Sequence, residues 1–275
     1  MGTPTPQVMV TLNLDRPMGL LHLGVDSNMV ALRATLRSLE DGSMLAKGGL
    51  PRPGTLLQFC LEPPIVKEDE TARLCNRAFV SIVAELVACI DRFIALELTL
   101  ARKGPLPAGI ATEQDVIRHI DGLIEEDYST IAADKRRSSP SKLESFPGIF
   151  PFAREAALSF FDLRTCIEHH AGRAKRDLTL RYWRPKLMSG DMELTKPGQP
   201  GKVGEGISLG ADHVAKSVPA GSLVRLEEAE LETIAMTVTL IIGPELCRVV
   251  KEKLAPPAPT SATPPTPTAE VSSGS

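Results

Sequence analysis

The chain has 275 residues, 43% of them hydrophobic, so it can bury a sizeable core in one principal domain. A formal net charge of -3 excludes a general attraction to nucleic acid, and contact with RNA would need a local basic patch. Only 4% of the residues are aromatic, which disfavours a platform of stacking rings and favours an aliphatic helical core.

Cysteine usage and hydropathy bear on the cellular compartment. The five cysteines are odd in number and show no C-x-x-C spacing, which argues against a disulfide framework or a structural zinc site. The sequence has no basic segment followed by an apolar leader and no apolar run of about 18 residues. We therefore expect a soluble cytoplasmic protein without membrane contact.

The first 64 residues have the least regular pattern, and we interpret them as an N-terminal elaboration on the main domain. Residues 7–14 alternate as a short strand, and residues 56–61 are a candidate second strand that ends at Pro63. Between them, Asp26 and Ser27 are candidate caps for a helix over residues 28–39.

Amphipathic helices dominate the middle of the chain. Apolar residues at three- and four-residue steps predict a long helix from Asp69 to Ala101, whose core positions are Cys75, Phe79, Ile82, Val83, Leu86, Ile90, Phe93 and Ile94. A second helix should begin at Thr112 and end past Tyr128, with an inner face of Val116, Ile117, Ile120, Leu123 and Ile124. Residues 135–140 then read as a short basic loop, either a solvated connection or a phosphate contact.

The C-terminal third combines helix, strand and tail. A third helix is expected from Phe152 to about His170, followed by a strand over residues 177–183 and a loop or loose hairpin over 189–222. A last helix should open near Glu227 and run to Leu254, kinked or divided at Gly243-Pro244. Residues 255–275, rich in Pro, Thr and Ser, are expected to be a disordered tail.

Residues 160–173 concentrate the side chains that can do chemistry. Arg164 and His169 would lie about one and a third turns apart near the end of the third helix. A guanidinium that is always charged can hold a phosphate, and an imidazole can move a proton at neutral pH. The spacing by itself is weak, since Arg16 and His22 match it by chance.

The text around this pair carries more. The run Leu-Arg-Thr-Cys-Ile-Glu-His-His-Ala-Gly-Arg, residues 163–173, resembles the HEPN family, whose hallmark is R-x4-6-H followed by a small or Gly-rich turn. The resemblance implies an antiparallel helical bundle over residues 65–254, with Arg164 and His169 as catalytic residues and His170 also within the permitted spacing. Many members of the family are metal-independent ribonucleases that act as toxins or defence effectors.

The mechanism that the resemblance implies needs no metal and no cofactor. His169 would serve as general base on the ribose 2'-OH or as general acid toward the leaving 5' oxygen, while Arg164 stabilises charge on the phosphorus. The products would be a 2',3'-cyclic phosphate and a 5'-OH. Members of the family commonly form homodimers that build one composite cleft. A toxin of this kind also implies a neutralising partner protein.

Basic residues gather directly after the motif and are the candidate RNA contacts: Arg173, Lys175, Arg176 and Arg181, together with Thr165 next to the catalytic arginine. An acidic chain that places its cations beside its Arg/His pair favours a polyanionic ligand. The basic edge of a β-hairpin would give the same pattern.

An alternative from another class is a non-catalytic HEPN-like module that binds RNA, a nucleotide or a protein, or that only dimerises. Thr165 favours it, because the family commonly has Asn or Asp at that position and a hydroxyl offers neither charge nor amide. The two readings predict different geometry. A catalytic pair should be exposed in a basic cleft, whereas a structural pair should be buried, with Arg164 bound to Glu168 or Asp162. Other enzyme classes lack their motifs, such as a Walker loop or H-E-x-x-H.

Overall fold

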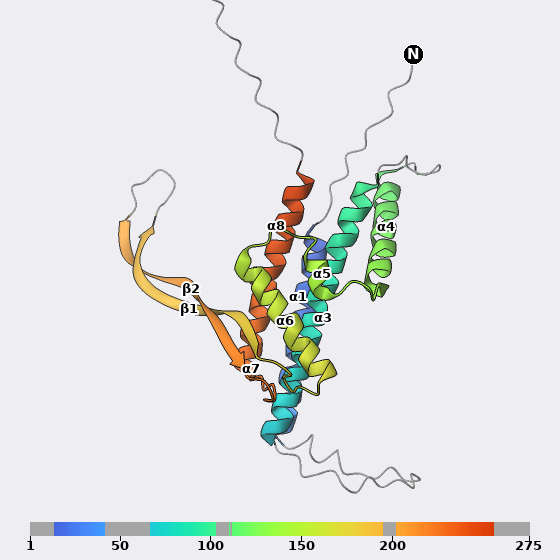
Figure 1. The fold of residues 1–275 in the computed structure, drawn as a ribbon. Helices are drawn as coiled ribbons and strands as arrows, with labels where there is room; N and C mark the ends of the chain where they lie inside the picture. The colour runs from blue at the N-terminus through green and yellow to red at the C-terminus, as the bar shows by residue number, and fades with distance from the viewer. Residues whose placement is uncertain (1–13, 42–66, 103–109, 111, 195–201, 256–275) are drawn as a thin grey trace, which may run out of the picture.

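The computed structural model describes residues 14–41, 67–102, 110, 112–194 and 202–255 (Figure 1). These residues are mainly helical, with a small two-stranded sheet, which confirms the predicted fold class at this level. The expected strands at 7–14 and 56–61 and the expected tail at 255–275 fall almost wholly outside the described residues.

Two long helices, α1 (Asp15–Glu40) and α3 (Lys67–Ala101), lie side by side (Figure 1). All eight predicted core positions of α3 are buried, as expected. The prediction for residues 28–39 was too short, and Asp26 and Ser27 lie inside the helix instead of capping it. The cause is a stripe of buried residues at helical spacing that begins earlier: Leu21, Val25, Met29, Leu32, Leu36 and Leu39. Most of this stripe belongs to the same core as α3, so α1 is part of the helical body and not an addition to it.

Three helices follow: α4 (Glu113–Ala133), the short α5 (Ser139–Leu143) and α6 (Pro151–His169). Thr112 caps α4 in a reciprocal capping box with Asp115. The predicted inner face of α4 was partly wrong, because Ile117 is 44% exposed where α4 packs mainly on α3. Helix α5 was missed, since five residues after a basic loop carry no periodic signal.

The sheet is an antiparallel ribbon of β1 (Leu178–Leu194) and β2 (Lys202–Val218), which extends away from the helices (Figure 1). Leu178 pairs with Val218 at the base of the ribbon and Leu194 pairs with Lys202 at its far end. The hairpin reading of residues 189–222 is therefore confirmed, and β1 is longer than predicted. Leu178, Leu180 and Tyr182 are buried on one side, as expected.

The last helix runs without a break through α7 (Glu228–Thr237), a π-helical segment (Val238–Ile242) and α8 (Gly243–Leu254). The predicted kink at Gly243-Pro244 is replaced by this wider turn, in which the Gly243 N–H donates to the Val238 carbonyl. The turn accommodates Pro244, which has no N–H to donate to the preceding turn.

Among the described residues, one helix, Glu228–Leu254, has the length and composition to cross a membrane. In this fold, however, 67% of its most apolar window is buried inside the protein, as in the core helix of a soluble domain. The cytoplasmic location remains a prediction.

Candidate functional site at the end of helix α6

The chain turns sharply where α6 ends. His170 caps the helix, and Ala171 and Gly172 have φ values of 49° and 74°, in the left-handed region. The Gly172 N–H donates to the Cys166 carbonyl at 3.2 Å, which closes the last turn. Leu163 and Cys166 are buried, so Arg164 and Thr165 lie on the side of α6 that faces away from the core.

Arg164 and His169 line the same pocket, which has a volume of about 350 Å³ and lies between α6 and the start of α5. Ser138, Ser139 and Pro140 contribute lining residues from the α5 side. His169 is exposed, so its imidazole is accessible to a ligand in the pocket. The structure therefore brings together the cation and the imidazole that the motif singled out.

Arg164 already has a partner inside this pocket. Its Nε donates to Glu168 Oε2 at 2.9 Å and its Nη2 donates to Glu168 Oε1 at 3.2 Å. The two side chains are 26% and 34% exposed, so this is a half-exposed pair of opposite charges one turn apart on the helix. The geometry combines the two expected cases: the pocket is open, as a catalytic pair requires, and Arg164 is bound to Glu168, as a structural pair requires.

Thr165 and His170 have local roles. The Thr165 hydroxyl donates to the Phe161 carbonyl at 2.9 Å, a common use of threonine within a helix. Thr165 lines the pocket, so its side chain adjoins the site even though its proton is used. His170 is partly buried at the helix cap and is not among the residues that line the pocket. Of the two candidate histidines, only His169 is placed beside Arg164.

The basic residues after the motif are largely paired with acids of α6 or with backbone. Arg176 Nη2 donates to Asp162 Oδ2 at 3.0 Å, and Arg181 Nε lies 3.5 Å from Glu155 Oε2. Arg173 Nη1 donates to the Gly221 carbonyl at 2.6 Å, and Lys175 is exposed.

Arg176 and Arg181 line a neighbouring pocket of about 460 Å³, which shares Asp162 with the first. Much of the predicted basic patch is therefore a face of mixed charges beside the site.

A buried ion pair fixes the wall opposite Arg164, and sequence reasoning missed it. Lys142 Nζ of α5 donates to Asp91 Oδ2 of α3 at 2.9 Å, and the side chains are only 6% and 4% exposed. Burial raises the pKa of Asp91, while the hydrogen bond and charge of Lys142 oppose that rise. The available signal was an aspartate directly after Ile90 in the apolar stripe of α3, a place where a charge needs a partner.

Comparisons with models of known protein families, with curated proteins and with solved structures found no match for this chain. The resemblance to the HEPN family thus rests on the residues around Arg164 and His169.

Proposed function

We propose that this protein is a HEPN-like, metal-independent endoribonuclease, whose helices form the family's antiparallel bundle and whose catalytic pair is Arg164 and His169. One observation supports the proposal above the others: the guanidinium and the exposed imidazole line one open pocket. A role as a toxin or defence effector, restrained by a neutralising partner, belongs to the same proposal.

The chemistry follows from the two side chains. His169 takes the proton of the ribose 2'-OH or delivers one to the leaving 5' oxygen. Arg164 offers a planar fork of N–H donors, which suits the oxygens of a phosphate as well as those of a carboxylate. The phosphate of the substrate therefore replaces Glu168 as the acceptor for Arg164 and receives its charge as the 2'-oxygen attacks. A second copy of the chain, with its own motif beside the first, would supply the remaining cations of a composite cleft.

The test is cleavage of total RNA and of a tRNA pool by the purified protein in EDTA. His169→Ala should lower the rate by about 10²–10⁴-fold, the usual contribution of a general acid or base. His119→Ala, on α4 and outside the pocket, is the matched control and should cleave as the parent does. The fragments should end in 2',3'-cyclic phosphate and 5'-OH. If His169→Ala cleaves as fast as the parent, the mechanism is wrong.

A second candidate, a non-catalytic HEPN-like module that binds RNA, is favoured by the ion pair between Arg164 and Glu168. In that case Glu168 stabilises the helix end, and RNA is bound but not cut.

Glu168→Gln separates the two candidates. The change removes the charge that competes with phosphate for Arg164, so the ribonuclease should cleave faster, by roughly tenfold if one charge-assisted bond is released. Glu155→Gln, on the same helix but paired with Arg181, should leave cleavage unchanged. RNA binding without cleavage by the parent and by Glu168→Gln would favour the non-catalytic module.

A further inference from the structure

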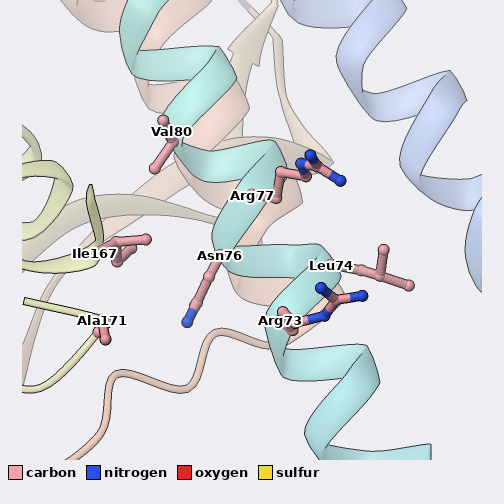
Figure 2. Close-up of a pocket in the computed structure, with 8 residues that line it drawn as sticks. Arg73, Leu74, Asn76, Arg77, Val80, Ile167 and Ala171 are labelled. Carbon is pink, nitrogen blue, oxygen red and sulfur yellow. The ribbon is translucent and has the colours of Figure 1, made fainter. Parts of the chain in front are cut away.

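A second pocket, of about 410 Å³, lies on the other side of the last turn of α6, between α3 and the loop at Ala171 and Gly172 (Figure 2). It contains neither Arg164 nor His169. Its α3 residues include Arg73, Asn76, Arg77 and Val80, whose spacing places them along one stripe of the helix. The pocket is therefore built by regular structure on one side and by a tight turn on the other.

One end of this pocket is cationic. Arg73 and Arg77 are one turn apart on α3, where two like charges repel each other. Arg73 donates to both carboxylate oxygens of Glu70, at 2.8 Å and 2.6 Å. Within the described ranges, no hydrogen bond or ion pair engages the guanidinium of Arg77, which is exposed. An anion placed here would gain a fork of free donors and relieve the repulsion.

The rest of the pocket is apolar. Leu74, Val80 and Ile167 line it and are partly buried, packed against the core with one side left open. In Figure 2, Asn76 and Val80 lie on the side of α3 that faces Ile167 and Ala171, and the guanidinium groups of Arg73 and Arg77 extend toward the opposite side. A ligand that fills the pocket would need a charged end and an apolar end.

Asn76 adds a polar group between the two ends. Its Nδ2 donates to the Val224 carbonyl at 2.9 Å, which fixes the orientation of the amide. Its Oδ1 is buried and has no hydrogen-bond partner among the residues that the structure describes. A buried acceptor without a donor is unfavourable, so a ligand that carries a donor would stabilise this side chain.

We infer that this pocket binds a small amphiphilic organic anion. A carboxylate or phosphate head group would bind at Arg77, and an apolar body would cover Val80 and Ile167. The volume is within the usual range for small-molecule sites, about 300–1,000 Å³. The inference is independent of the proposed ribonuclease activity, because the two pockets share no residue.

Calorimetric titration of the full chain with 4-phenylbutyrate, phenyl phosphate and inorganic phosphate tests the inference. At least one of the two amphiphilic anions should bind, and the tighter one identifies the head group. Inorganic phosphate should bind about tenfold more weakly or less, since it cannot cover the apolar surface. Absence of binding by both amphiphilic anions, or inorganic phosphate binding as tightly as phenyl phosphate, would overturn the inference.

Variants locate the binding. Arg77→Ala should weaken binding of the amphiphilic anion about tenfold or more, because it removes a charge-assisted bond. Arg118→Ala, at a 76% exposed arginine of α4, is the matched control and should bind as the parent does. Arg77→Gln provides a second variant with a longer polar side chain, and circular dichroism checks that both are folded. Equal binding by the parent and both Arg77 variants would contradict the assignment, and RNA cleavage by these variants should equal that of the parent.

Discussion

Replacement of Lys142 by methionine should lower the free energy of unfolding by about 3–5 kcal/mol, because the change leaves a buried carboxylate without its cation. Lys142 and Asp91 are both almost fully buried, and their hydrogen bond is 2.9 Å long. Asp91 Oδ1 has no other partner in the described part of the chain, so Lys142 supplies the main compensation for this charge. Urea unfolding measures the loss.

The loss should depend on pH. Without Lys142, burial raises the pKa of Asp91 further above its ordinary value, because the opposing hydrogen bond and charge are gone. A folded protein that binds a proton more tightly than the unfolded chain loses stability as pH rises through the window between the two pKa values. The deficit of Lys142→Met relative to the parent should therefore be larger at pH 7 than at pH 4–5.

Two further variants make this prediction specific. Lys175→Met, at an exposed lysine, should change stability by less than about 0.5 kcal/mol. The double variant Asp91→Leu with Lys142→Met should recover most of the loss, since an apolar pair often replaces a buried ion pair without cost. A single variant as stable as the parent would show that Asp91 is not held as a charge. Because α5 carries one wall of the Arg164 pocket, Lys142→Met should also slow RNA cleavage.

Phe160→Ala should destabilise the protein by about 3–5 kcal/mol, through lost burial and the cavity that remains. Phe160 of α6 meets Phe79 of α3 edge to face, with ring centroids 6.0 Å apart and an angle of 86° between the ring planes. Both rings are completely buried. The contact joins the helix that carries Arg164 and His169 to the longest helix of the core.

The matched control for this prediction is Phe150→Ala, at a ring that is 53% exposed just before α6. Its loss in chemical unfolding should be well below 1 kcal/mol, because little buried surface disappears. Phe160→Leu should lie between the two variants. Equal losses for Phe160→Ala and Phe150→Ala would contradict the packing between α3 and α6.

Where a segment has a strong local pattern, the sequence was sufficient. Helix α3 follows from apolar residues repeated every three or four positions, because such a stripe can be buried only in a helix of that period. The end of α6 follows from Ala171-Gly172, and the buried side of β1 follows from the alternation of Leu178, Leu180 and Tyr182. The shared location of Arg164 and His169 is also local, since helical geometry places residues five apart near each other.

The partners of those residues were decided by tertiary structure. Glu168 was one of two acids named for Arg164, and the sequence offered no means of choosing between it and Asp162, which is bound to Arg176. The α5 wall, the Lys142–Asp91 pair and the second pocket at Arg77 all join segments distant in the chain. Such contacts depend on how the helices pack, and a periodic pattern carries no information about which helix lies opposite. The sequence alone thus determined the helices and the reactive pair, whereas only packing decided what surrounds them.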